Sequence, residues 1–184
     1  GTRKIAPALA AGCTVVLRPA SLTPLTAVAL GHLILQAGMP AGVVNIVPSS
    51  RSAEVSTTWL EDSRVRAVSF TGSTQVGRVL MKQAAEKVLV SSMELGGNAP
   101  FVVAADADID AAVTGAVQAK LRGGGEACTA ANRFYVHQDV AQEFTEKFSA
   151  VVRDLRVGPA LADEANQIGP LVTTAARDKI NALV

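Results

Sequence analysis

The sequence predicts an α/β fold built on a doubly wound parallel sheet. Short apolar segments rich in β-branched residues alternate with amphipathic helical segments over the first half of the chain. Such alternation is typical of parallel strands that are joined by right-handed helical crossovers. The pattern stops at Gly96-Gly97 and then starts again. We therefore predict a boundary there, with residues 1–96 in one domain and residues 97–184 at the start of a second α/β domain.

The first domain is predicted to hold strands that are buried on both faces, because its apolar runs show no polar alternation. These runs are residues 13–17, 43–47, 65–70 and 88–93. Periodic apolar positions predict helices before and between the strands, at residues 4–11, 24–37, 52–60 and 73–85. Thr23 is expected to cap the second of these helices, with Pro24 at its first position.

The second domain is predicted to begin with a short strand at residues 100–103 and an acidic helix start. The aspartates in that start are favourable beside the helix dipole, and the helix runs to about Leu121. A glycine-rich loop that carries Cys128 follows it. Further on we expect a strand at 133–137, a helix at 140–153, a loop at 158–170 and a last helix capped by Thr173.

The composition excludes several classes of protein. A net charge of +1 and 4% aromatic residues provide neither the basic patch nor the stacking platform of a nucleic-acid binder. No apolar run is long enough to span a membrane, and the isolated cysteines and histidines do not predict a disulfide framework or a metal site. We expect a reducing compartment, the cytoplasm, or the mitochondrial matrix in a eukaryote. Because the chain begins and ends within periodic patterns, we expect it to be an internal fragment of a longer protein.

Polar residues are predicted to gather at the carboxyl edge of the first sheet, where such folds bind ligands. The residues at this edge are Arg18, Ser49, Ser50, Gly72, Ser73 and Glu94. Gly72-Ser73 opens a helix, so that free N–H groups and a hydroxyl can bind a phosphate. The spacing to Gly77 resembles a P-loop, but the lysine that a P-loop requires does not follow, which argues against an NTPase. The alternative is that Ser73 only caps the helix.

Arg18 and Ser21 suggest whether a nucleotide with a 2′-phosphate could bind at this edge. Arg18 can meet a ribose or phosphate, although a solvated strand end is the alternative. Ser21 is small and neutral, whereas a carboxylate near this place would repel a 2′-phosphate. The sequence therefore tolerates NADP as well as NAD, with NADP slightly favoured.

Glu94, Cys128 and Arg122 are the candidates for chemistry. A carboxylate at the end of an apolar strand, as Glu94 is, suits a general base, and a salt-bridged or solvent-facing glutamate is the alternative. Cys128 stands behind three glycines, which suggests a nucleophilic thiol in a close turn, or else a small core residue in an ordinary loop. Arg122 can recognise a carboxylate, or can simply stabilise a helix C-terminus.

Together these residues resemble the NAD(P)-dependent aldehyde dehydrogenase family, over all 184 residues. The motifs stand in the family's order: residues 5–17 (IAPALAAGCTVVL), Phe70-Thr71-Gly72-Ser73-Thr74, Glu94-Leu95-Gly96-Gly97 and the Cys128 loop. Residues 94–101 and 131–136 look most like those of succinate-semialdehyde dehydrogenases. The resemblance implies a Rossmann-like coenzyme domain, followed by the start of a catalytic domain that carries the nucleophile.

The resemblance also implies a role for each candidate residue. Cys128 matches the nucleophile that forms a thiohemiacetal and then a thioester, and Glu94 matches the base that activates water for hydrolysis. Arg122 matches the arginine that binds the substrate carboxylate of succinate semialdehyde. The positions that match cofactor contacts are Arg18, Ser21, Gly72, Ser73, Val76 and Leu95. The parent protein is expected to be a homo-oligomer, a dimer or tetramer, that acts on a small aldehyde.

The sequence departs from the family's pattern at the loop itself. The usual Asn-x-Gly-Gln before the cysteine is Gly123-Gly124-Gly125-Glu126, which loosens the loop and places a negative charge near the thiolate. Arg18 stands where the family usually has lysine, and Ala130 stands where some relatives have a second cysteine. The family's oxyanion-hole asparagine and its Glu-x-Phe-Gly segment lie outside this chain, so the fragment alone is expected to be inactive or nearly so. The alternatives are a CoA-acylating relative, which Glu94 disfavours, and a non-catalytic nucleotide-binding or structural descendant.

Overall fold

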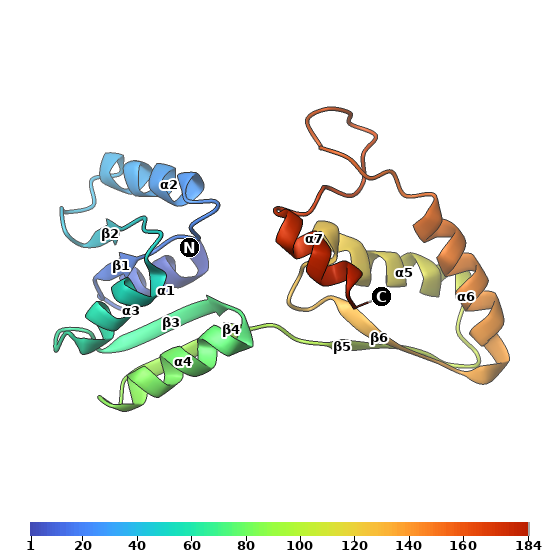
Figure 1. The fold of residues 1–184 in the computed structure, drawn as a ribbon, viewed down its shortest axis with the longest axis horizontal. Coiled ribbons are helices and arrows are strands. Elements are labelled where there is room, and N and C mark those ends of the chain that lie inside the picture. Colours follow the sequence, from blue (N-terminus) through green and yellow to red (C-terminus); the bar gives the residue numbers. More distant parts are fainter. Residues whose placement is uncertain (184) are drawn as a thin grey trace. The chain divides into compact units, whose positions relative to one another are not determined.

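A computed structural model describes residues 1–183 of the chain. The chain divides into two compact units, of which unit 1 spans Gly1–Leu95 and unit 2 begins at Gly96. This division lies beside the glycine pair at which the sequence pattern restarts. The two units are described separately below (Figure 1).

Unit 1 alternates helices and strands as predicted. Its elements are α1 (Thr2–Ala10), β1 (Val15–Leu17), α2 (Leu25–Gln36), β2 (Val44–Ile46), α3 (Ser52–Glu61), β3 (Ala67–Gly72), α4 (Thr74–Ala85) and β4 (Val90–Leu95). β1 pairs with β2, and β3 pairs with β4, both in parallel. A helix connects the two strands of each pair, since a parallel pair requires a crossover connection. The expected α/β class with parallel strands is therefore confirmed.

The helices of unit 1 approach their strands closely at two glycines. A Cβ at Gly31 of α2 would lie 2.8 Å from Ile46 of β2, and one at Gly77 of α4 would lie 2.6 Å from Leu95 of β4. The predicted burial of the strands on both faces is wrong for the described chain, because Val16 and Val90 are 48% and 72% exposed. Each strand has a single strand partner there, in sheets of two strands.

Side-chain hydrogen bonds cap several of the described helices. Ser73 Oγ accepts from the Val76 amide at 3.3 Å, and Asp108 Oδ1 accepts from the Ala111 amide at 3.0 Å. Thr173 caps the last helix as predicted, through the Ala176 amide. The predicted Thr23 cap is wrong: α2 begins one residue later than expected, with Pro24 as its N-cap and no side-chain cap. The Thr23 amide instead closes a turn onto the Ala20 carbonyl.

Unit 2 is a parallel strand pair covered by helices. Its elements are β5 (Ala99–Val103), α5 (Ile109–Leu121), the short 3₁₀ turn η1 (Arg122–Gly125), β6 (Ala131–Val136), α6 (Gln138–Arg153) and α7 (Thr174–Asn181). β5 and β6 pair in parallel along their length, and α5 forms the crossover between them. The C-terminal end of α5 therefore leads directly to the glycine turn and Cys128.

The core of unit 2 holds α5 in place. Val103, Ile109, Val113, Ala116 and Phe144 form a buried cluster from β5, α5 and α6. Three further phenylalanines pack against it, with ring centroids 5.3 to 6.5 Å apart, a range in which aromatic rings attract one another. Burial of this cluster fixes the helix that carries Arg122 at its end.

An ion-pair cluster on the surface also joins α5 to α6. Lys147 of α6 lies 2.6 Å from Asp110 of α5 and 2.8 Å from Glu143 of its own helix. The hydrogen bonds to Asp110 and to Glu143 raise the pKa of Lys147 above its ordinary value. The lysine therefore remains charged at any physiological pH. No helix among residues 1–183 has both the length and the hydropathy needed to cross a membrane.

Candidate functional site

The turn between β3 and α4 has the geometry of an anion site. Gly72 ends β3, and Ser73 is the N-cap of α4 with an extended backbone. The Ser73 hydroxyl accepts from the Val76 amide, so it does cap the helix. The remaining amides of the first helical turn have no partner within the helix, as at every helix N-terminus, and such groups attract phosphates. Capping and phosphate binding are therefore compatible here.

A second polar cluster lies where β1 and β2 end. Arg18 Nη1 donates to Ser21 Oγ at 3.1 Å and to the Ser49 carbonyl at 3.4 Å. The Ser21 hydroxyl donates to the same carbonyl at 3.1 Å. Ser21, Ser49 and Ser50, with neighbouring Ala20 and two prolines, line a pocket of about 260 Å³. The parallel register of β1 and β2 thus brings together residues that the sequence placed at one sheet edge.

Glu94 and Leu95 end β4, opposite Thr71 and Gly72 of β3. Leu95 packs on Gly77 of α4, which fixes the end of the strand against the helix. Glu94 is exposed, and within residues 1–183 it has no ion-pair partner. In the described chain Glu94 is thus a solvent-facing carboxylate, and its role as a general base stays a prediction.

The glycine turn before Cys128 has a backbone that other residues rarely adopt. Gly123, Gly124 and Gly125 have φ values of +62°, +73° and +79°. This left-handed region costs an ordinary L-residue about 1–2 kcal/mol. Three such residues in succession turn the chain from the end of α5 toward Cys128. The glycines that replace part of the usual family motif are thus required by the conformation seen here.

Cys128 is exposed and unpaired, and its backbone is well supported. The Ala130 amide donates to the Ala127 carbonyl at 2.9 Å, which forms a turn around the cysteine. Ala130 is 2% exposed, so the chain is anchored in the interior directly after the turn. A Cβ at Gly97 would lie 3.0 Å from the Cys128 carbonyl oxygen. Gly97 therefore allows the segment that follows β4 to lie against the backbone of the cysteine.

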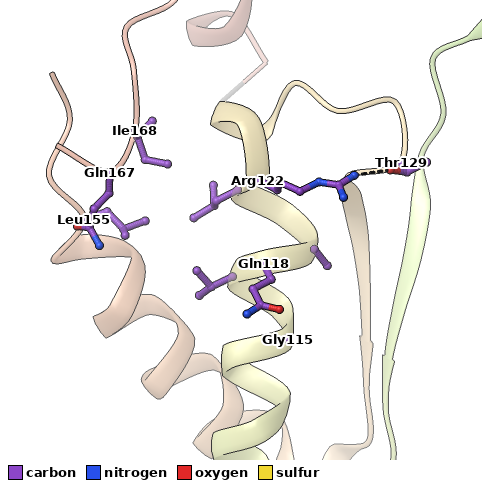
Figure 2. Close-up of a pocket in the computed structure, with 10 residues that line it drawn as sticks. Gly115, Gln118, Arg122, Thr129, Leu155, Gln167 and Ile168 are labelled. Atoms are coloured by element: carbon purple, nitrogen blue, oxygen red, sulfur yellow. Dashed lines mark hydrogen bonds between the residues drawn. The ribbon is translucent and has the colours of Figure 1, made fainter. Parts of the chain in front are cut away.

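A groove of about 690 Å³ runs across α5 beside this turn (Figure 2). Arg122 is the one charged residue in its lining, and Gln118 lies one helical turn before it. Figure 2 shows the Arg122 side chain extending from the end of α5 toward Thr129, whose Oγ1 accepts from Arg122 Nη2 at 3.4 Å. Apolar side chains of Val117, Leu121, Leu155 and Ile168 complete much of the lining. The groove thus combines an apolar wall with one cation.

The sequence analysis assigned no role to three polar residues of this groove, Gln118, Thr129 and Gln167. The spacing of four between Gln118 and Arg122, on one helical face, was a signal for the first of them. Nothing in the local pattern predicted the contact of Thr129, because the course of the chain through the three glycines decides it. Among residues 1–183, no group of three or more His, Cys, Asp or Glu side chains is arranged to hold a metal ion.

A model of the aldehyde dehydrogenase family matches residues 1–184. The chain belongs to this family. It is 59% identical over 183 residues to a succinate-semialdehyde dehydrogenase of Paenarthrobacter nicotinovorans, a match that covers 100% of this chain and 40% of the relative. It is 50% identical to the NADP(+) succinate-semialdehyde dehydrogenase of Escherichia coli K12, over 97% of this chain and 37% of that protein. The chain thus spans about two fifths or less of the length of these aldehyde dehydrogenases.

Solved aldehyde dehydrogenase structures have the same fold. A succinate-semialdehyde dehydrogenase from Burkholderia pseudomallei matches with a TM-score of 0.93 and 46% identity, over 98% of this chain and 37% of that one. An aldehyde dehydrogenase of Bacillus cereus, solved as an NAD+ complex, matches with a TM-score of 0.93 and 33% identity, over 98% and 36% of the two chains. The predicted resemblance to this family is confirmed, and a structural or CoA-acylating descendant is not favoured.

Proposed function

We propose that the protein to which this chain belongs is an NAD(P)-dependent aldehyde dehydrogenase that oxidises succinate semialdehyde or a related short aldehyde acid. The 59% identity to a succinate-semialdehyde dehydrogenase across the whole chain carries this proposal. The groove lined by Arg122 and by Thr129, the residue after Cys128, supports it, since its single cation, Arg122, suits a substrate with a carboxylate at the far end. Residues 1–96 would serve as the C-terminal part of the coenzyme domain, and residues 97–184 as the N-terminal part of the catalytic domain.

The thiol of Cys128 would attack the aldehyde carbon as its thiolate and form a thiohemiacetal. The bound dinucleotide would supply the hydride acceptor. Loss of the hydride leaves a thioester on Cys128. Glu94 would then take a proton from water, which attacks the thioester and releases the carboxylic acid and the thiolate. The net reaction consumes aldehyde, water and oxidised cofactor, and yields the carboxylic acid, reduced cofactor and one proton.

The cofactor would be held by residues of unit 1. Ser73 and the first turn of α4, with Gly72 and Val76, suit the pyrophosphate because free amides point from a helix N-terminus. Leu95 lies at the end of β4 and would meet the nicotinamide end through its backbone. Arg18 and Ser21 would face the adenosine ribose, where a cation and a neutral hydroxyl accept the 2′-phosphate of NADP.

Substitution of Ser21 by glutamate should shift the intact enzyme from NADP toward NAD. A carboxylate at this place repels a 2′-phosphate but accepts hydrogen bonds from a ribose diol. We expect kcat/KM for NADP to fall by about 10- to 100-fold, with a smaller change or a gain for NAD. Steady-state kinetics with both cofactors measures this. Ser21→Ala is the matched control and should keep the native preference; an unchanged preference in Ser21→Glu would contradict the role of Ser21.

Substitution of Arg122 by glutamine should remove the selectivity for acidic aldehydes. An unpaired substrate carboxylate loses a charge-assisted hydrogen bond, which corresponds to about 10- to 100-fold in kcat/KM. The loss should fall on succinate semialdehyde and spare butanal, which has the same number of carbons and no carboxylate. Arg122→Lys keeps the charge without the planar fork and should lie between the two.

A steady-state assay of the full-length protein with NAD and NADP against several aldehydes tests the proposed function directly. If acetaldehyde were as good a substrate as succinate semialdehyde, the carboxylate role of Arg122 would be wrong. We expect the fragment alone to be inactive, because it spans two fifths or less of its relatives. The homo-oligomeric state and the cytoplasmic or mitochondrial-matrix location stay proposals, the latter supported by the two free cysteines.

A further inference from the structure

We propose that Thr129 is a positioning residue, which holds the guanidinium of Arg122 at a fixed position relative to Cys128. It would thereby contribute to the selectivity for aldehydes with a distal carboxylate. The inference rests on the proposed function of the same site. Thr129 follows the cysteine directly, and its hydroxyl accepts a hydrogen bond from Arg122 across the glycine turn. The contact joins the two ends of the loop that presents the thiol.

Arg122 needs such a partner because its own surroundings restrain it little. It follows the last residue of α5 and begins the turn of three left-handed glycines, which have no side chains to pack against it. Arg122 is exposed, and a free arginine side chain samples many rotamers. Among residues 1–183, Thr129 Oγ1 is the one group that hydrogen bonds with its guanidinium. Without this contact, the cation would not be held at a defined place in the groove.

Thr129 is itself well placed to hold another side chain. It lies within the turn closed by Ala127 and Ala130, and the two residues that follow it are 2% and 3% exposed. Its β-branched side chain has few rotamers, so the hydroxyl position follows from the backbone. The bond takes up part of the donor capacity of the guanidinium and leaves its other N–H groups for a substrate carboxylate. Substrate recognition is thereby coupled to the position of the neighbouring thiol.

Both residues line the same groove, and Figure 2 shows them joined by their hydrogen bond at one side of it. A carboxylate that binds Arg122 would therefore lie at a distance from Cys128 set by the Arg122–Thr129 contact. An aldehyde without a carboxylate would not bind Arg122, so the Arg122–Thr129 contact would not affect its binding. Loss of the hydroxyl should thus affect one class of substrate and leave the other unchanged.

The test uses the full-length enzyme with Thr129→Val, Thr129→Ser, Arg122→Gln and the double variant Arg122→Gln/Thr129→Val. Valine keeps the shape of threonine and removes the acceptor, whereas serine keeps the acceptor. We expect Thr129→Val to raise KM for succinate semialdehyde by about 3- to 10-fold, as for the loss of one hydrogen bond, with little change in kcat. Kinetics with butanal should not change. Thr129→Ser should restore the native KM, and Thr129→Val should have no further effect in the Arg122→Gln background.

Each other outcome overturns the inference in a recognisable way. An equal loss of kcat for both aldehydes in Thr129→Val would mean that Thr129 supports the thiol loop and does not position Arg122. Additive effects in the double variant, or no rescue by serine, would likewise refute the coupling. If the native enzyme showed no preference for succinate semialdehyde over butanal, the proposed function would fail, and the inference with it. If that preference depended on Arg122 but not on Thr129, the inference alone would fail.

Discussion

Substitution of Cys128 by alanine should abolish aldehyde oxidation by the intact enzyme, with a fall in kcat of at least about 10³-fold. The reason is that, in the proposed mechanism, every covalent step passes through this thiol: without it there is neither a thiohemiacetal from which hydride can leave nor a thioester. Binding of the cofactor should persist, because the residues proposed to hold it lie in unit 1. Steady-state turnover and cofactor titration, measured on the same preparation, separate the two effects.

Cys13 provides a matched control for this prediction. Both cysteines are exposed and unpaired, so a difference in alkylation rate would report thiol reactivity and not access. We expect iodoacetamide to label Cys128 first and to inactivate the enzyme in step with labelling, whereas Cys13→Ser should keep full activity. Equal labelling rates, or an active Cys128→Ala enzyme, would contradict the nucleophilic role and favour a non-catalytic descendant.

Substitution of Glu94 by glutamine should arrest the reaction after hydride transfer. Glutamine keeps the size of the side chain but cannot accept the proton of the attacking water, so hydrolysis of the thioester should slow by about 10²- to 10⁴-fold. Because hydride transfer precedes hydrolysis in the proposed mechanism, rapid mixing should still show a burst of reduced cofactor. An acyl adduct on Cys128 should then be seen by intact-mass spectrometry.

Glu86 provides the control for this substitution. It is an exposed glutamate at the end of α4, also in unit 1, and Glu86→Gln should leave turnover unchanged. Absence of the burst in Glu94→Gln would place the residue at an earlier step, and normal turnover would exclude it as the base. Acceleration of the native enzyme by coenzyme A would instead support the CoA-acylating alternative.

Much of the fold was predictable because its signals are local. The apolar runs that became β1 to β6, the Ser73 and Thr173 caps, and the glycine-rich segment before Cys128 all depend on residues that are close in sequence. The wrong prediction of a Thr23 cap has the same local origin. In a threonine followed by proline, either the threonine or the proline can be the residue before the helix begins. The burial of the strands was not predictable, because it depends on how many strands and layers surround each one.

The sequence by itself determined the α/β class, the family and the candidate nucleophile, base and arginine. Only the tertiary structure decided which of these side chains meet. The contact of Arg18 with Ser49 spans 31 residues and depends on the register of β1 against β2. The contact of Arg122 with Thr129 depends on three positive φ angles, which three consecutive glycines permit but do not require. Hydrogen bonds between distant side chains follow from the path of the backbone, and that path is an outcome of packing.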